Sequence, residues 1–222
     1  MRMLDKNMDT GKVVIEDDRN IRCLYVDGSL ESAVYLRKEK KKDLVFPYLR
    51  ALKYPMSLVQ GKKEVYLIGS GGFCYPYTFL HEEEGNITSA EMSKDIIECA
   101  RTYFYLKEIE EDPRFTLIQG DGFSYLEKCE KTFDVIINDA FIGKHPVGLD
   151  EKNTKNIQEH LSYRGIYVIN YVASIEEESI QQQLDILEKY FKYSTVMIVD
   201  DEIEQEEKQN MLMMCSNTDY GW

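Results

Sequence analysis

The chain has 222 residues, which is long enough for one main domain with a sizeable hydrophobic core. Its formal net charge of -13 disfavours duplex nucleic acid and anionic membrane surfaces as partners, and no apolar run approaches the roughly 18 residues of a membrane helix. Because the N-terminus lacks the apolar core of a signal peptide, we expect a cytoplasmic protein without a nucleic-acid or membrane partner.

The N-terminal part has a different residue pattern from the rest of the chain. Turn residues separate short runs of β-type residues there, which predict strands over 12–16, 21–26 and 32–36. The pair Asp27-Gly28 predicts a hairpin, and a short helix, interrupted by Pro47, is expected over 44–53. We therefore divide the chain into a small N-terminal β-sheet appendage with a linking helix, 1–60, and a main domain, 61–222.

The main domain begins with a strand, a glycine-rich turn, a helix and a second strand. The pattern predicts a buried parallel strand over 65–68, a helix over 75–84 and a strand over 87–91. The turn after the first strand reads Gly69-Ser70-Gly71-Gly72. Glycines let a backbone approach a ligand closely, and Glu91, about 20 residues on, is placed to accept hydrogen bonds from ribose hydroxyls. The alternative is a tight turn under a closely packed helix.

A dinucleotide-binding fingerprint is incomplete in this turn. It needs a glycine where Cys74 stands, so a pyrophosphate contact is disfavoured. Cys74 lies at a helix N-terminus, where it is either a reactive thiol or a packing residue. The five cysteines form no Cys-x-x-Cys and the three histidines are dispersed, so the sequence predicts no metal site.

Helices and strands alternate after Glu91. Helices are predicted over 93–105, 122–129, 151–160 and 175–191. Strands are predicted over 114–119, 133–138, 165–172, 195–199 and 211–215. The strand over 133–138 is the most apolar and is expected at the centre of the sheet. An acidic loop, 200–210, joins the last two strands.

Seven strands that end in a hairpin make an α/β pattern that differs from the symmetric dinucleotide fold. The pattern resembles the Rossmann-like, seven-stranded fold of S-adenosylmethionine-dependent methyltransferases, in which the seventh strand inserts antiparallel beside the sixth. A fold class does not specify a reaction, so the function depends on the residues at the strand ends.

Ligands of an open α/β sheet bind at the carboxyl ends of the strands, where Asp121 and Asp139 stand. Asp121 lies between glycines, where it can cap the next helix, hydrogen-bond an adenine edge, or do both. Asp139 is placed to hold and deprotonate an amine nucleophile; the alternatives are a loop cap or an ion pair with Lys144. We assign His145, in the following loop, to substrate contact rather than to a general base.

Motifs from about residue 21 to 172 resemble, in order, those of the spermidine synthases and spermidine synthase-like proteins. The first half has a strand similar to their Asp-Gly-x-x-Gln segment, a substrate tyrosine and the glycine turn: Tyr25-Val26-Asp27-Gly28-Ser29-Leu30-Glu31, Phe46-Pro47-Tyr48, and Ile68-Gly69-Ser70-Gly71-Gly72 with Pro76. The second half continues with Ala90-Glu91-Met92, Asp112-Pro113-Arg114, Gly120-Asp121-Gly122 and Asp134-Val135-Ile136-Ile137-Asn138-Asp139. Several ordered matches are more specific than any single motif.

The resemblance implies a transferase that binds decarboxylated S-adenosylmethionine and moves its aminopropyl group to a small-molecule amine in polyamine biosynthesis, without a metal. It assigns the ribose to Glu91, the adenine to Asp121 and acceptance of the amine proton to Asp139. The other cofactor-binding positions that it implies are Gly69, Ser70, Gly71, Gly72, Met92 and Gly122. The acceptor-binding positions are Glu31, Tyr48, Ile142 and His145.

The acceptor half departs from the family pattern. Gly72 and Ile142 stand where the synthases carry aspartates, Glu31 stands at the glutamine position, and Leu49-Arg50 replaces a His-Glu pair. Aminopropyl transfer is therefore the leading hypothesis beside two others, a methyltransferase that uses intact S-adenosylmethionine and a non-catalytic nucleoside-binding or assembly module. The acceptor and the oligomeric state, a homodimer included, stay open.

Overall fold

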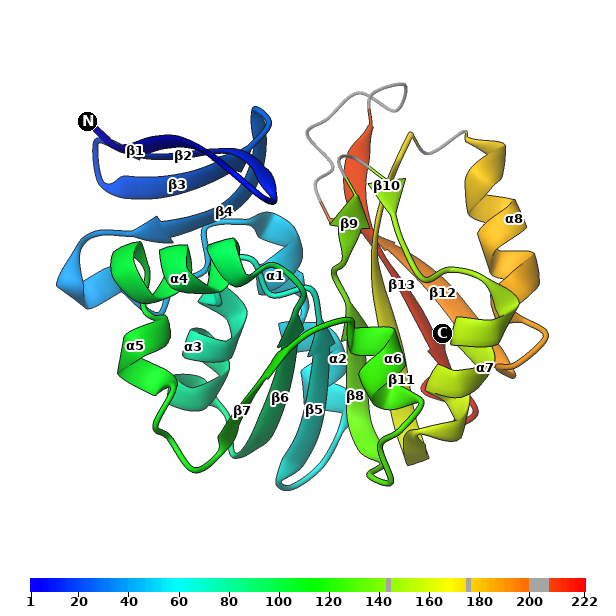
Figure 1. The fold of residues 1–222 in the computed structure, drawn as a ribbon. Helices are drawn as coiled ribbons and strands as arrows, with labels where there is room; N and C mark the ends of the chain where they lie inside the picture. Colours follow the sequence, from blue (N-terminus) through cyan, green and yellow to red (C-terminus); the bar gives the residue numbers. More distant parts are fainter. Residues whose placement is uncertain (143–144, 175–176, 200–207) are drawn as a thin grey trace.

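The structure, a computed structural model, describes residues 1–142, 145–174, 177–199 and 208–222. Its centre is a seven-stranded sheet in the order β12-β13-β11-β8-β5-β6-β7 (Figure 1). The strands are β5 (Lys63–Ile68), β6 (Gly85–Glu91), β7 (Phe115–Gln119), β8 (Phe133–Asn138), β11 (Leu161–Ala173), β12 (Tyr193–Ile198) and β13 (Gln209–Ser216). Only the pairings made by β13 are antiparallel, to β11 and to β12. The antiparallel insertion of the last strand and the central position of β8 are therefore confirmed.

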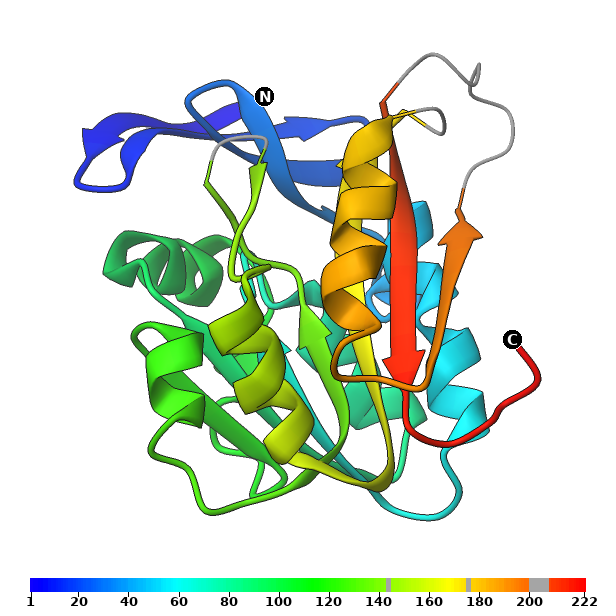
Figure 2. The same cartoon turned by 90° about the vertical axis from the view of Figure 1, so that its right-hand side faces the viewer.

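Helices cover both faces of this sheet (Figure 2). One face carries α1 (Pro47–Ala51), α2 (Lys53–Leu58), α3 (Cys74–Glu82), α4 (Lys94–Tyr103) and α5 (Leu106–Ile109). The other face carries α6 (Gly122–Leu126), α7 (Glu151–Glu159) and α8 (Glu178–Leu187). Each face has its own cluster of buried apolar side chains. None of the helices in the described parts of the chain is long and apolar enough to cross a membrane.

Three predicted elements differ from the structure or extend beyond the described residues. The helix predicted over 93–105 stops at Tyr103, and α5 follows as a separate helix. This break lets Phe104 and Leu106 both enter the core, where they are buried. The beginning of the helix predicted over 175–191 and most of the acidic loop predicted over 200–210 lie outside the described residues.

The N-terminal residues form a separate antiparallel sheet in the order β1-β2-β3-β4. Its strands are β1 (Arg2–Met8), β2 (Gly11–Asp18), β3 (Ile21–Val26) and β4 (Ser29–Tyr35). The predicted Asp27-Gly28 hairpin is confirmed, with φ angles of 48° and 84° that suit a tight two-residue turn. We did not predict β1, because this mostly exposed edge strand has no apolar alternation and is held by backbone pairing to β2. Val13, Ile15 and Leu24 join the core on the α3 side of the main sheet.

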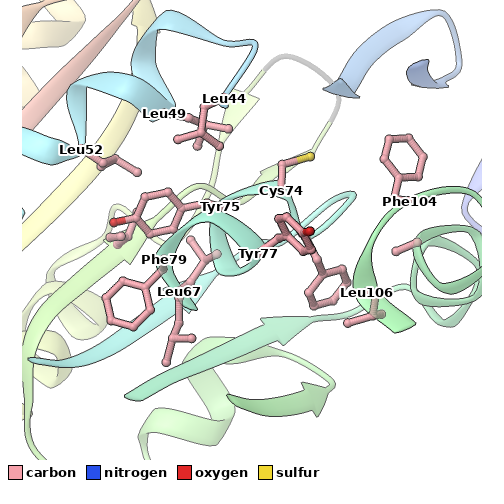
Figure 3. Packing of buried hydrophobic residues seen from close by; sticks show 14 of the residues in the cluster. Leu44, Leu49, Leu52, Leu67, Cys74, Tyr75, Tyr77, Phe79, Phe104 and Leu106 are labelled. Atoms are coloured by element: carbon pink, nitrogen blue, oxygen red, sulfur yellow. The ribbon is translucent and has the colours of Figure 1, made fainter. Parts of the chain in front are cut away.

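Helix α3 is buried along almost its whole length, and this fixes the glycine turn that precedes it. Figure 3 shows its side chains Tyr75, Tyr77 and Phe79 among residues from the neighbouring elements, including Leu67 of β5. Because α3 is apolar on all sides, it cannot shift without exposing core side chains to water.

Phe73 connects the turn to α3 in a left-handed conformation (φ 58°) that is unfavourable for a bulky residue. Its ring is fully buried and meets Phe115 edge-on. We expect Phe73→Ala to lower the free energy of unfolding by about 3 to 5 kcal/mol, and Phe73→Gly by about 1 kcal/mol less, because glycine relieves the strain.

Urea denaturation of both variants tests this order. The matched control is Phe79, inside α3, where glycine should be the more damaging replacement by about 1 kcal/mol. The strain at Phe73 is disproved when glycine is also the worse replacement there.

Candidate active site

The glycine turn after β5 folds around the carboxylate of Glu91. Glu91 ends β6, the neighbour of β5, and its side chain reaches the turn. Its Oε2 atom accepts hydrogen bonds from the backbone N–H groups of Ser70 (3.2 Å) and Gly71 (3.1 Å), and Oε1 accepts from that of Ser93 (2.9 Å). The carboxylate therefore occupies the position at which a dinucleotide fold offers its amides to a pyrophosphate.

The next backbone amides of the turn also have partners. Gly72 N–H donates to the Ser32 hydroxyl of β4 (2.7 Å), and Phe73 N–H donates to the Ser70 carbonyl (2.8 Å). These partners leave the turn poorly suited to a phosphate, in agreement with its incomplete fingerprint. The arrangement suits a ligand with hydroxyl donors.

The turn is in direct contact with the backbone at Asp139. A Cβ atom on Gly69 would lie 2.5 Å from the Asp139 carbonyl oxygen, so only glycine fits at this position, where φ is 83°. Asp139 N–H in turn donates to the Ile68 carbonyl (2.8 Å). This close packing brings the predicted cofactor-binding turn and the predicted catalytic residue Asp139 to one place.

Asp139 follows β8, and its half-buried carboxylate is held by two side chains from other elements. Tyr48 of α1 donates to Oδ2 (3.0 Å), and the Asn170 amide of β11 donates to Oδ1 (2.7 Å). Burial raises the pKa of Asp139 to about 7, with a further contribution from the Glu31 charge, although both hydrogen bonds oppose the increase. A carboxyl that titrates near neutral pH is suited to accept and release a proton.

Among the described residues of the loop that follows Asp139, none donates a hydrogen bond to its carboxylate. The neighbouring residue Asn138 caps this loop, because the Asn138 oxygen accepts from Ala140 N–H (3.2 Å) and its amide donates to the Val147 carbonyl (2.8 Å). The alternative partner Lys144 lies outside the described residues. In the described part of the chain, the carboxylate of Asp139 is hydrogen-bonded to Tyr48 and Asn170.

Glu31 brings a third carboxylate to the same region from the N-terminal sheet. It lies at an irregularity in the β3–β4 pairing, where Leu24 and Tyr25 face Ser32 and Leu30 and leave Glu31 without an opposite residue. Burial and the charge of Glu91 raise its pKa to about 7. Glu31, Glu91 and Asp139 therefore interact electrostatically, and a cationic ligand would relieve their repulsion.

The raised pKa of Asp139 predicts a pH-dependent stability. In the unfolded chain this carboxyl ionises near about pH 4, so between about pH 4 and 7 the folded protein keeps a proton that the unfolded chain has lost. Its contribution to stability is present below about pH 4 and is lost as the pH rises to about 7. We expect Asp139→Asn to be more stable than the wild type at about pH 8, by on the order of 2 kcal/mol after allowance for solvent screening, and similar at about pH 4.

Urea denaturation across this range measures the difference. The substituted amide can keep both neighbours, since its oxygen can accept from Asn170 and its nitrogen can donate to the Tyr48 oxygen. A variant less stable than the wild type at about pH 8 would instead show that the Asp139 carboxylate stabilises the fold.

The other predicted cofactor residues lie around this region with different surroundings. Asp121 caps α6 by accepting from Phe123 N–H (3.0 Å), so the capping role is confirmed. Gly122 packs against the sheet, where an added Cβ would lie 2.7 Å from Ile68. Met92 is 69% exposed beside Glu91. Contacts of these residues with a cofactor stay predictions.

Two predicted acceptor residues lie on a small hairpin that we did not predict. Its strands are β9 (Phe141–Ile142) and β10 (His145–Pro146), in which Ile142 is paired with His145. Ile142 is 67% exposed and His145 is also exposed. Their contact with an acceptor stays a prediction.

Sequence reasoning missed Ser32 and Asn170, both of which are buried. Ser32 belongs to the other sheet, and nothing in the local pattern connects it to the glycine turn. Asn170 did leave a signal, because it is a polar residue inside an apolar strand, a position that usually has a hydrogen-bond partner.

Cys74 is a packing residue in this structure. Its thiol is buried, and burial raises its pKa to about 12, which disfavours the reactive thiolate. Within the described ranges no three His, Cys, Asp or Glu side chains are arranged to hold a metal. A surface pocket of about 600 Å³, lined by residues that include Tyr190, Phe191 and Trp222, does not involve Glu31, Glu91 or Asp139.

The strand order, with its antiparallel insertion, and the helices on both faces define a protein of the S-adenosylmethionine-dependent methyltransferase fold. The carboxylates of Glu91, at the end of β6, and of Asp139, directly after β8, lie at the strand ends where open α/β sheets in general bind ligands. The chain belongs to the spermine/spermidine synthase domain family, whose family model matches residues 50–217.

The sequence identities between this chain and individual related proteins are low. The chain is 28% identical over 184 residues to a polyamine aminopropyltransferase of Hydrogenobaculum sp., covering 81% of this chain and 61% of that protein. It is 26% identical over 180 residues to an eEF1A lysine and N-terminal methyltransferase homolog of Drosophila melanogaster, covering 75% of this chain and 25% of that protein. A probable spermidine synthase of Corynebacterium glutamicum has the same fold, with a TM-score of 0.82, 18% identity, and coverage of 99% of this chain and 81% of the other. The chain thus spans less than two thirds of these curated relatives.

Proposed function

We propose that the protein is a spermidine synthase-like transferase that moves the aminopropyl group of decarboxylated S-adenosylmethionine to a small-molecule amine. The observation that carries this proposal is the Asp139 carboxylate, which is held by Tyr48 and Asn170 on a residue whose backbone packs against Gly69 of the glycine turn. The carbon next to the positively charged sulfur of the donor is already activated for attack. When the amine forms a bond to this carbon, the carbon–sulfur bond breaks and methylthioadenosine leaves as a neutral thioether. The protein therefore needs to align the amine with the carbon next to sulfur and accept its proton.

The donor half of the site is built on the turn and Glu91. The Glu91 carboxylate accepts hydrogen bonds from the ribose hydroxyls, which replace those from the Ser70 and Gly71 N–H groups. Asp121 and Gly122 border the adenine. Met92 covers the nucleoside from the exposed side. These roles are supported by the family match over residues 50–217 and by the position of Glu91 at the strand end.

The acceptor half uses Asp139, Glu31 and Tyr48, with Ile142 and His145 at the rim. An amine reaches the site mostly as a cation and must lose a proton before it attacks. Carboxylates with a pKa of about 7, such as Glu31 and Asp139, can attract the cation when ionised and take up that proton. No step of this mechanism uses a metal.

Methyl transfer from intact S-adenosylmethionine is the second candidate, favoured by the similarity to the Drosophila methyltransferase homolog. Intact S-adenosylmethionine has a carboxylate that the decarboxylated donor lacks. Among the described residues, Glu31 and Asp139 would repel this group, and electrostatics therefore favours the decarboxylated donor.

Calorimetric titration with decarboxylated S-adenosylmethionine, S-adenosylmethionine and methylthioadenosine separates the candidates. We expect the decarboxylated donor to bind more tightly than the intact one. Tighter binding of intact S-adenosylmethionine would favour the methyltransferase, and failure of all three to bind in the millimolar range would refute the nucleoside site. Binding of these ligands without turnover on a panel of amines would favour the hypothesis of a non-catalytic nucleoside-binding module.

The role of Glu91 makes a separate prediction. Glu91→Ala should weaken methylthioadenosine binding by about 1 to 3 kcal/mol, the range for hydrogen bonds to a charged group. The control is Glu64→Ala at the opposite end of β5, which should leave the affinity unchanged. Equal affinity of the Glu91 variant and the wild type would remove Glu91 from the nucleoside site.

A further inference from the structure

Asn170 interrupts an otherwise apolar row on β11. Ile166 and Val168 face the same side of the sheet and belong to its apolar core, whereas Asn170, the next residue on that side, is an amide that is only 3% exposed. Burying an amide is unfavourable unless it gains hydrogen bonds. The buried Asn170 amide therefore needs hydrogen-bond partners.

Those partners form a chain across three adjacent strands. Asn210 of β13 donates through Nδ2 to Asn170 Oδ1 (2.8 Å), and Asn170 of β11 donates through Nδ2 to Asp139 Oδ1 (2.7 Å) at the end of β8. The sheet register places these residues near one another, since Ile169 is paired with Asn138 and Asn210 is paired with Val172, the next residue after Asn170 on the same side of β11. Because Asn210 occupies the oxygen of Asn170, the nitrogen of Asn170 is turned to the carboxylate.

We propose that Asn170 is a positioning residue for Asp139 and that Asn210 sets the orientation of the Asn170 amide. A flipped Asn170 would direct its oxygen at the carboxylate, which has no donor to offer when ionised. Asn210 opposes the flip, because a flipped Asn170 would present its amide nitrogen, a donor, to the donating Nδ2 group of Asn210. The inference rests on the proposed role of Asp139 as proton acceptor.

The chain of amides also affects proton binding at Asp139. A donor to the carboxylate favours its ionised form and opposes the effects of burial and of nearby negative charge. Among the described residues, the titratable groups that face Asp139 are Glu31 of β4, Tyr48 of α1 and Cys74 of α3. Removal of the Asn170 donor leaves Tyr48 as the other hydrogen bond to this carboxylate.

Carboxyl NMR titration of the full chain, with the Asp139 signal assigned by its loss in Asp139→Asn, tests the proposal. We expect the Asp139 midpoint to move to higher pH by about one pH unit or more in Asn170→Leu, and in the same direction but by less in Asn210→Leu. The double variant should match Asn170→Leu, since Asn210 acts through Asn170. The control is Ser216→Ala, which removes a buried contact between β11 and β13 at their other end and should leave the midpoint unchanged.

An unchanged midpoint in Asn170→Leu, or an additive effect of Asn210→Leu, overturns the proposal. Asn210 is only half-buried, so its variant gives an answer even when Asn170→Leu folds poorly. The titration needs neither donor nor acceptor, and it therefore succeeds or fails independently of aminopropyl transfer. With an active wild type, the acid limb of the kcat profile should shift with the NMR midpoint.

Discussion

Asp139→Asn is expected to lower turnover by about 100-fold or more while cofactor affinity changes little, because a positioned general base contributes about this much. The substituted amide can keep its contacts with Tyr48 and Asn170 but cannot accept the proton of the attacking amine. Release of methylthioadenosine, measured with decarboxylated S-adenosylmethionine and an accepted amine, gives the rate.

Two further measurements separate proton transfer from a loss of structure. The control is Asp134→Asn at the start of β8, at the opposite end of the strand from Asp139. The Asp134 carboxylate also accepts two hydrogen bonds, from Glu64 N–H (2.9 Å) and from the Ser162 hydroxyl (2.7 Å). The defect of Asp139→Asn should also shrink as the pH approaches about 10, where free amines lose their proton in solution. Turnover equal to that of the wild type would limit Asp139 to a structural role.

Putrescine is expected to be a poor acceptor, with an affinity lower than that of a fully equipped site by on the order of a hundredfold to ten-thousandfold. A diamine is a dication whose two ends each need an anionic partner, and Gly72 and Ile142 replace two aspartates of the family pattern. Each lost charged hydrogen bond costs about 1.5 to 3 kcal/mol. Glu31 opposes this loss, since its carboxylate lies near Asp139 and can hold one ammonium when ionised.

The structure decides which replacement gives the cleaner test. Ile142 is 67% exposed, so Ile142→Asp should fold normally. A Cβ on Gly72 would lie 3.0 Å from both Phe104 and Ser32, so Gly72→Asp requires these neighbours to move and must be checked for folding. We expect spermidine formation to rise in Ile142→Asp and further in a folded double variant. Ile198→Asp, at another exposed isoleucine, is the control, and efficient use of micromolar putrescine by the wild type would contradict the prediction.

The sequence by itself determined the alternation of the main domain and the positions of its strand ends. Apolar runs followed by glycine or a carboxylate are local patterns, and parallel strands bring their carboxyl ends to one edge of a sheet. The approximate positions of β5, β6 and β8 could therefore be predicted, together with Glu91 and Asp139 at their ends. The ordered motifs predicted the family, which the match over residues 50–217 shows.

Only the tertiary structure decided how these residues meet. The bond between Tyr48 and Asp139 joins positions far apart in the chain, and the support from Asn170 and Asn210 depends on the order and register of β8, β11 and β13. The strand β1 was not predictable, because backbone pairing, which carries no side-chain signature, holds it in place. The raised pKa of Asp139 likewise depends on burial by elements from several parts of the chain, and local sequence patterns carry no information about such long-range contacts.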